Sequence, residues 1–188
     1  MVSSRTSGDR GLAQGSRVQG PRLVVEDLIR VYRTLYLEVI SLRGVSLTLD
    51  QSESIAIMGP SGSGKTTLLN LVGGLDRPTA GRILLDGVDI TKLEPEELVR
   101  YRREKVGFVF QSFNLIPTLK AVQNVELPMI ATGCHKSERR RRASKLLQIV
   151  GLSDRASHKP TELSGGEQQR VAIAASLAND PPLILADE

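Results

Sequence analysis

The amino-acid sequence predicts a mixed α/β fold, with a mostly parallel sheet and a helical part late in the chain. Between about residues 22 and 110, short apolar runs typical of strands alternate with segments whose apolar residues have helical spacing. From about residue 121 to residue 178 the pattern is predominantly helical, and one more apolar run follows. The chain has 188 residues, of which 40% are hydrophobic and 24% charged, a balance typical of one globular domain.

Composition excludes several classes of protein. No stretch approaches the roughly 20 apolar residues that a membrane-spanning helix needs, so we do not expect a membrane-embedded chain. Cys134 is the only cysteine, which excludes an internal disulfide, and with His135 and His158 it makes no convincing zinc site. Aromatic residues make up 3%, which argues against single-stranded nucleic-acid binding because few stacking platforms are available. The net charge of +4 attracts phosphates, anionic lipids or nucleic acid without distinguishing among them.

The first elements are expected after a polar N-terminus. Residues 1–20 are rich in Gly, Ser, Arg and Gln, and we expect a disordered tail because they are too polar to bury. A first strand is predicted at 23–25. Apolar and polar residues alternate over 45–49, which predicts a second strand. The run 54–58 is apolar, contains β-branched residues and stops at Gly59, which predicts a buried strand.

The middle of the chain alternates between helix and strand patterns. A helix is predicted at 66–75, because its apolar residues have helical spacing and two glycines mark its end. The runs 82–85 and 88–90 flank an Asp-Gly pair, which is a strong signal for a β-hairpin. Another helix begins near Pro95, where the missing N–H of proline does no harm and the next two acidic residues lie at the positive end of the helix dipole. The run 106–110 predicts a further strand.

The last third of the chain predicts helices followed by one strand. Ser137 can cap the start of a helix whose apolar residues share one face, and Gly151 can terminate it. A second helical run follows the turn 163–168. The final apolar run, 183–186, predicts a short buried strand that ends in two acidic residues.

A glycine-rich octet lies between the apolar run 54–58 and the helix predicted after it. It fits G-x-x-x-x-G-K-[ST], in which glycines let backbone N–H groups surround phosphate oxygens and the helix adds its positive dipole end. The alternative is a Gly/Ser-rich turn with a chance lysine, but the position between strand and helix favours nucleoside triphosphate binding. Lys65 would contact the β- and γ-phosphates and Thr66 would ligate Mg²⁺. The candidate residues are Gly59, Pro60, Ser61, Gly62, Ser63, Gly64, Lys65, Thr66 and Thr67.

Two acidic residues follow the last predicted strand. Asp187 comes directly after the run 183–186, a position from which an aspartate can hold Mg²⁺ in folds with such a loop. Glu188 follows and would polarise the attacking water. The alternative is a solvated acidic pair after a strand, but the upstream phosphate loop favours catalysis.

The turn 163–168 offers a second candidate anion site. Ser164 and Glu167 have the spacing of a capping box, which is a purely structural explanation. Gly165 and Gly166 are unexpected in a simple cap, because glycine weakens helices. The two glycines are explained if another molecule must approach the backbone closely. A serine hydroxyl and free N–H groups at a helix start can bind an anion there.

Together these motifs resemble the ATP-binding-cassette (ABC) ATPases, and in particular the subfamily that powers lipoprotein release and macrolide or peptide export. The resemblance extends from about residue 22 to the end of the chain. The stretches that carry it are Ile57–Lys65, Gly73–Thr79, Phe108–Thr118, Leu163–Gln168 and Ala178–Leu183.

The resemblance implies roles for individual residues. Two ATPase subunits would meet head to tail, with ATP between the loop of one and the turn of the other, so that Ser164, Gly165, Gly166 and Gln168 contact nucleotide bound by a partner. Tyr32 would stack on adenine, with Tyr36 as its rival and a plain surface tyrosine as the alternative. The implied catalytic residues are Glu188, Gln111 and Lys65, and the implied Mg²⁺ ligands are Thr66, Gln111 and Asp187.

The resemblance also implies the fold and its divisions. It predicts a P-loop NTPase core, an N-terminal antiparallel β subdomain and a helical subdomain at about 112–165. Family members continue for several further strands and helices, so residues 21–188 would form an incomplete ATP-binding domain that lacks its last strands. We expect such a C-terminally truncated chain to bind ATP weakly and to hydrolyse it poorly on its own.

The implied partners are a second ATPase subunit and a transmembrane permease, which Phe113–Thr118 would face at the cytoplasmic side of the cell membrane. No nucleic-acid partner is expected. Two alternatives stay open: a soluble ABC ATPase without a role in transport, and a nucleotide-binding fragment without turnover. Long coiled-coil insertions or a second cassette, which are usual in the translation and repair types, are not seen in the sequence.

Overall fold

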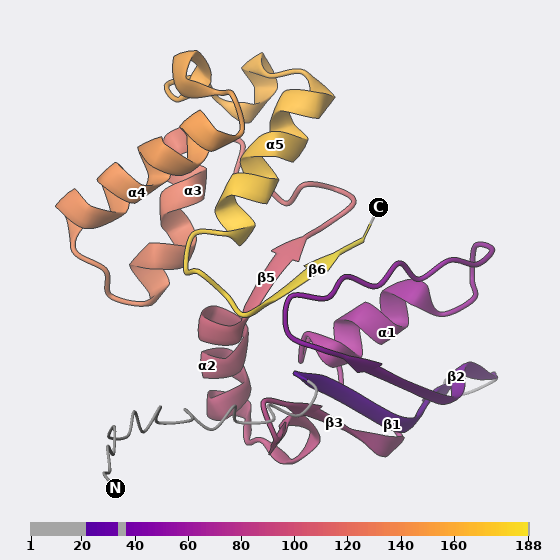
Figure 1. Ribbon diagram of the computed structural model, residues 1–188. Coiled ribbons are helices and arrows are strands. Elements are labelled where there is room, and N and C mark those ends of the chain that lie inside the picture. Colours follow the sequence, from indigo (N-terminus) through magenta and orange to yellow (C-terminus); the bar gives the residue numbers. More distant parts are fainter. Residues whose placement is uncertain (1–21, 34–36, 188) are drawn as a thin grey trace, which may run out of the picture.

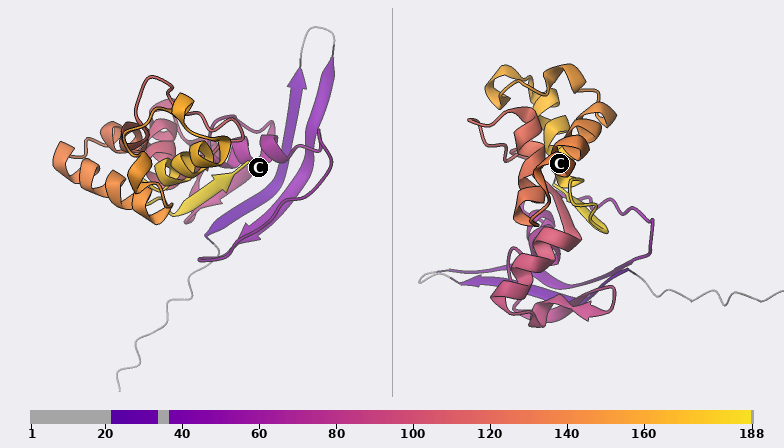
Figure 2. Two further views of the ribbon diagram at one scale, coloured as in Figure 1. Left: turned by 90° about the horizontal axis from the view of Figure 1, so that it is seen from above. Right: turned by 90° about the vertical axis from the view of Figure 1, so that its left-hand side faces the viewer.

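The computed structural model describes residues 22–33 and 37–187 (Figure 1). The tail predicted at 1–20 lies outside these residues, as do Tyr36 and Glu188. The described chain forms an antiparallel sheet, a parallel pair of strands and a group of helices (Figures 1 and 2). No helix in the described ranges has the length and apolar character needed to cross a bilayer.

The N-terminal sheet has the strand order β2-β1-β3-β4, and every neighbouring pair in it is antiparallel. This confirms the antiparallel N-terminal part that the resemblance implied. Both long strands extend well beyond the runs predicted at 23–25 and 45–49. The bounds are β1 Leu23–Arg33, β2 Glu38–Leu49, β3 Ala80–Leu85 and β4 Val88–Asp89.

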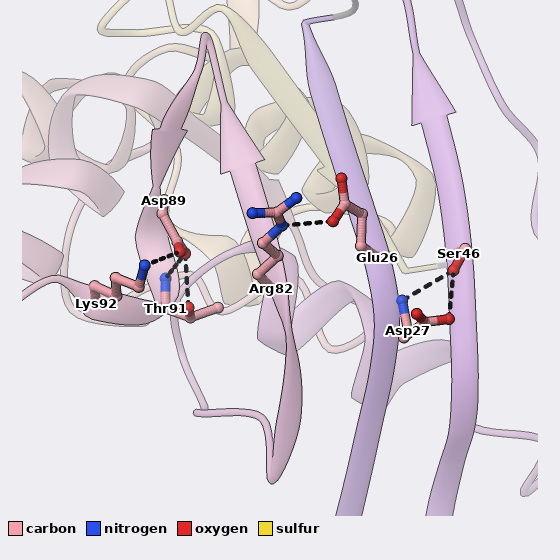
Figure 3. Close-up of polar contacts among 7 residues, drawn as sticks. All are labelled: Glu26, Asp27, Ser46, Arg82, Asp89, Thr91 and Lys92. Atoms are coloured by element: carbon pink, nitrogen blue, oxygen red, sulfur yellow. Dashed lines mark hydrogen bonds and ion pairs between the residues drawn. The ribbon is translucent and has the colours of Figure 1, made fainter.

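An irregularity in β1 lies at Asp27, where the register with both neighbours shifts. Asp27 has φ +45°, and its N–H donates to the hydroxyl of Ser46 on β2 at 2.9 Å (Figure 3). On the other side of β1, Glu26 pairs with Arg82 of β3 (Figure 3). A Cβ atom at Gly81 would lie 2.5 Å from the carbonyl oxygen of Asp27, so glycine is required where the bulge approaches β3.

Helix α1 (Lys65–Val72) packs against the N-terminal sheet, and α2 (Pro95–Lys105) follows the short 3-10 helix Ile90–Lys92. The Tyr101 hydroxyl of α2 donates to the carbonyl of Val72 at 2.7 Å, which ties α2 to the end of α1. Burial raises the pKa of the Tyr101 phenol. These helices and the sheet share one apolar core, whose fully buried side chains include Leu28, Leu71 and Ile83.

The described parallel pair consists of β5 (Val106–Val109) and β6 (Leu183–Ala186), with Val106 paired to Leu183. Gly107 lies where a Cβ atom would be 2.4 Å from the carbonyl oxygen of Ser176, so the strand passes directly against the end of α5. The parallel pairing brings the carboxyl ends of both strands to one edge.

The buried strand predicted at 54–58 is wrong. The segment forms no strand, and Ile55, Ile57 and Met58 are exposed by 44%, 39% and 90%. A cavity of about 750 Å³ is lined both by 54–57 and by 181–187. Because this space lies between the segment and β6, the described chain offers the segment no strand with which to exchange hydrogen bonds.

The helical group consists of α3 (Ala121–Ala131), α4 (Lys136–Ile149) and α5 (Gly165–Ser176), with two 3-10 turns at Ser153–Arg155 and Pro160–Glu162. These three helices share a second apolar core, and Figure 2 shows them as a body beside the sheets. Since α5 belongs to this core, the helical group continues past residue 165. The subdomain bounds of about 112–165 stay a prediction.

Candidate functional site

The candidate phosphate loop ends at Gly64, which precedes α1 and has φ +93°. A Cβ atom there would lie 2.6 Å from the carbonyl oxygen of Ser41 and 2.8 Å from Leu42 Cδ2, so only glycine fits. Gly62 also has a positive φ of +78°. Within the described chain no side chain caps the start of α1, which leaves the first N–H groups of the helix for an anion.

Lys65 extends back over this loop. Its Nζ atom donates to the carbonyl oxygens of Gly59 at 2.9 Å and Pro60 at 3.0 Å. Residues 57–63 are exposed, so the loop is open to solvent. An ammonium beside an open, glycine-rich backbone can exchange carbonyl oxygens for phosphate oxygens, and the residues present therefore fit a triphosphate.

Two predicted Mg²⁺ ligands meet beside the loop. The Thr66 hydroxyl donates to Asp187 Oδ1 at 3.2 Å, although the two residues are 121 positions apart. The backbone N–H of Asp187 donates to the carbonyl of Val109 at 2.9 Å, which fixes the residue at the end of β6. Gln111 follows β5 at the same edge, because β5 and β6 are parallel. The arrangement offers oxygen ligands of the kind that Mg²⁺ prefers.

The first turn of α1 is fixed to β2 close to Tyr32. The hydroxyls of Thr67 and Ser41 lie 2.8 Å apart. Ser41 follows Val39 by two residues, and Val39 is the partner of Tyr32 across β1 and β2. Tyr32 is 38% exposed, so its ring can still contact a ligand. Tyr36, the alternative aromatic residue, lies outside the described residues.

Sequence reasoning missed the residues that hold Tyr32. The Tyr32 hydroxyl donates to Asp76 Oδ2 at 2.9 Å, and Arg30 pairs with Asp76 Oδ1 at 2.8 Å. The Arg30 guanidinium lies 4.5 Å from the centre of the Tyr32 ring. Asp76 belongs to the stretch Gly73–Thr79, so the family resemblance was a signal for it, but nothing in the sequence pairs it with a residue 44 positions away.

The turn before α5 combines a cap with an open backbone. Ser164 accepts from the Glu167 N–H at 3.4 Å, and Glu167 Oε2 accepts from the Ser164 N–H and hydroxyl at 2.8 Å each, which confirms the capping box. A Cβ atom at Gly165 would meet nothing within 4 Å, and one at Gly166 would meet only Arg170 at 3.8 Å. The capping explains Ser164, but the open space beside both glycines is not needed for a cap.

The negative charge of Glu167 is stabilised by hydrogen bonds and by a nearby arginine. The N–H and hydroxyl of Ser164 and the nearby Arg155 guanidinium lower the pKa of the Glu167 carboxyl, whose oxygen lies 3.3 Å from Arg155 Nε. Gln168, predicted to contact nucleotide, donates to the carbonyl of Leu163 at 3.0 Å. The turn therefore has a defined shape before any ligand binds.

The two candidate anion sites belong to different parts of the fold. Helix α1, which begins at the loop, lies beside the N-terminal sheet, whereas α5, which begins at the turn, lies in the helical group (Figures 1 and 2). Residues 59–63 of the loop and 164–166 of the turn are exposed to solvent. Of the remaining predicted residues, Glu188 lies outside the described chain, so its role stays a prediction.

Comparison with known proteins gives consistent matches. The family model described as "ABC transporter" matches residues 42–188. An uncharacterized ABC transporter ATP-binding protein of Thermotoga maritima is 53% identical over 162 residues, which are 86% of this chain and 69% of that protein. The macrolide export ATP-binding/permease protein MacB of Hyphomonas neptunium is 49% identical over 168 residues, which are 89% of this chain and 26% of that protein.

Solved structures also match. The dimeric structure of a post-hydrolysis state of the ATP-binding cassette MJ0796, bound to ADP and Pi, has a TM-score of 0.83 and 46% identity. The match covers 88% of this chain and 73% of that chain. An uncharacterized ABC transporter ATP-binding protein of Methanocaldococcus jannaschii has the same name, MJ0796, and is 52% identical over 154 residues.

Proposed function

Because this chain belongs to the ABC transporter ATP-binding family, we propose that it binds ATP with Mg²⁺ at the loop 59–66 and takes part in hydrolysing it. The observation that carries the proposal is the contact between Thr66 and Asp187 beside Lys65. It joins a hydroxyl and a carboxylate from distant parts of the chain at the mouth of a loop shaped for phosphate.

The chain supplies each group that the proposal needs. The loop amides and Lys65 bind the phosphates, Thr66 and Asp187 bind the metal, and Gln111 with Glu188 orients the attacking water. When bound, Mg²⁺ supplies charge that stabilises the phosphate oxygens as the terminal phosphate leaves. Tyr32 contacts the adenine ring.

We further propose that the turn 164–168 of a second copy covers the bound ATP. The open space beside Gly165 and Gly166 supports this, since a phosphate can approach the backbone of α5 there. The structural neighbour MJ0796 is described as dimeric, which also supports a head-to-tail pair. A site built from two copies explains why one chain holds its two anion sites on separate helices.

The proposed role is to drive a membrane permease of the macrolide-export or lipoprotein-release type, at the cytoplasmic face of the cell membrane. A relative that joins an ATP-binding part and a permease in one protein supports this role. Phe113–Thr118 is the proposed contact with the permease. Phe113 and Asn114 have positive φ angles of 60° and 51°, so this loop has a tightly defined shape rather than that of a simple linker.

Calorimetric titration with MgATP tests the nucleotide site. We expect the unaltered chain to bind, and Lys65→Ala to weaken binding by at least about tenfold, because a charge-assisted contact to phosphate is lost. Lys145→Ala is the matched control, since Lys145 is an exposed lysine on α4, and it should leave affinity unchanged. Absence of MgATP binding by a well-folded unaltered chain would contradict the proposal.

A further inference from the structure

Asp76 is the centre of a small polar cluster beside Tyr32. Its Oδ1 atom accepts from Arg30 Nη2 and from the backbone N–H of Arg77, each at 2.8 Å. Its Oδ2 atom accepts from the Tyr32 hydroxyl at 2.9 Å. Both carboxylate oxygens are therefore engaged, and the side chains of Arg30 and Asp76 are only 22% and 27% exposed.

The same cluster restrains the ring of Tyr32. Arg30 lies over one face of the ring, 4.5 Å from its centre, while Asp76 holds the hydroxyl at the tip. A tyrosine at a strand end otherwise turns about its side-chain torsions. With its tip hydrogen-bonded and one face covered by a guanidinium, the ring is held in a single orientation.

The cluster is also attached to the helix that follows the phosphate loop. The backbone N–H groups of Leu75 and Asp76 donate to the carbonyl of Asn70, near the end of α1, at 2.8 and 3.3 Å. At the other end of α1, Thr67 contacts Ser41 of β2. Tyr32 is thus fixed relative to both ends of the helix that begins at Lys65.

We propose that Arg30 and Asp76 form a clamp that positions Tyr32 for stacking on the nucleobase, and so set the part of the affinity that comes from the base. This inference rests on the proposed function, because it needs nucleotide at the loop and Tyr32 as the base contact. Arg30 and Asp76 act through Tyr32 and are positioning residues. The clamp adds to nucleotide binding and does not act on the phosphates.

The test compares MgATP with magnesium tripolyphosphate, a ligand that has phosphates but no base. Titration calorimetry is performed on the unaltered chain, Tyr32→Phe and Asp76→Asn. Tyr32→Phe keeps the ring but removes the hydroxyl that Asp76 holds, and Asp76→Asn removes the charge that pairs with Arg30. We expect both variants to bind MgATP about 3- to 10-fold more weakly, because base–aromatic stacking is partly lost, and to bind tripolyphosphate unchanged.

A control and the remaining outcomes make the test decisive. Glu26→Gln breaks the exposed ion pair with Arg82 on the same sheet and should leave the affinity for either ligand unchanged (Figure 3). Unchanged MgATP affinity in either variant overturns the clamp, since the clamp needs both partners. An equal loss for both ligands also overturns it, because the cluster then supports the loop itself. If the unaltered, folded chain binds neither MgATP nor magnesium tripolyphosphate, the result is different, because it refutes the proposed function itself.

Discussion

Single side chains fix the backbone of this protein where regular structure is absent. Asn124, in the first turns of α3, is 4% exposed and uses both ends of its amide. Its Oδ1 atom accepts from the Ile116 N–H at 2.8 Å, and its Nδ2 atom lies 3.2 Å from the carbonyl oxygens of Ile116, Leu119 and Lys120. One buried amide thereby satisfies the backbone of the loop that we propose contacts a permease.

Replacement of this amide should be costly. We expect Asn124→Ala to lower the free energy of unfolding by about 2–3 kcal/mol, because the buried amide makes several hydrogen bonds to the loop backbone, each worth about 0.5–1.5 kcal/mol, and all of them are lost. Urea denaturation measures the change. Gln148→Ala, at an exposed position of α4, is the control and should stay within about 0.5 kcal/mol of the unaltered chain. A similar small change for Asn124→Ala would show that water replaces the amide.

At the scale of an element, α5 illustrates how a helix start serves both folding and a proposed site. The capping box of Ser164 and Glu167 satisfies the start of the helix, while Gly165 and Gly166 leave its backbone open. A cap without glycines would be more stable, because glycine weakens a helix. The helix start has both features, because the capping bonds join Ser164 and Glu167 while the space beside the two glycines stays open.

The lowered pKa of Glu167 makes this cap sensitive to acid. Its pKa lies below the ordinary 4.5 in the folded chain, so its stabilising effect is present above about pH 4.5 and is lost as the pH falls through the folded value. Glu167→Gln keeps an acceptor oxygen but removes the charge. We expect the melting temperature of the unaltered chain to exceed that of Glu167→Gln near neutral pH, and the difference to shrink as the pH falls below 4.5. A difference that does not depend on pH would contradict this account.

At the scale of the whole molecule, the helical group is joined to the rest of the chain at a few defined places. Asn179, in the connection between α5 and β6, donates to the carbonyls of Arg103 and Pro128 at 2.9 and 3.0 Å. These carbonyls belong to α2 and α3, so one side chain links both parts of the fold. Because Tyr101 ties α2 to the end of α1, Asn179 connects the helical group to the part of the fold that carries the loop 59–66.

The proposed two-copy site can be tested by mixing variants. Lys65→Ala impairs the loop, and Gly166→Asp places a carboxylate beside the turn, so each variant alone contains two impaired sites in a head-to-tail pair. An equal mixture also forms mixed pairs with one intact site. We expect sedimentation with MgATP to detect pairs for the unaltered chain and for the mixture, and fewer for each variant alone. If the mixture pairs no better than its components, the head-to-tail arrangement is wrong.

Parts of the fold and site follow from neighbouring residues, and the sequence predicts these well. The loop 59–66 depends on glycines with positive φ and on a lysine that folds back over five or six residues. The hairpin around Asp86 and the capping box at Ser164 are similarly local, and the structure confirms both. Features that depend on distant residues are harder to predict. The strand predicted at 54–58 needs a neighbouring strand, which the described chain does not bring to it.

The sequence by itself determined the local shape of the loop 59–66 and of the turn before α5, because each is a contiguous motif whose geometry depends on its own backbone. Only the tertiary structure decided that Thr66 meets Asp187 and that Asp76 holds Tyr32, because these pairs are separated by 121 and 44 positions. Their meeting depends on the parallel pairing of β5 with β6 and on the packing of α1 against the N-terminal sheet. Such long-range packing results from the burial of apolar surface over the whole chain, and no local pattern specifies it.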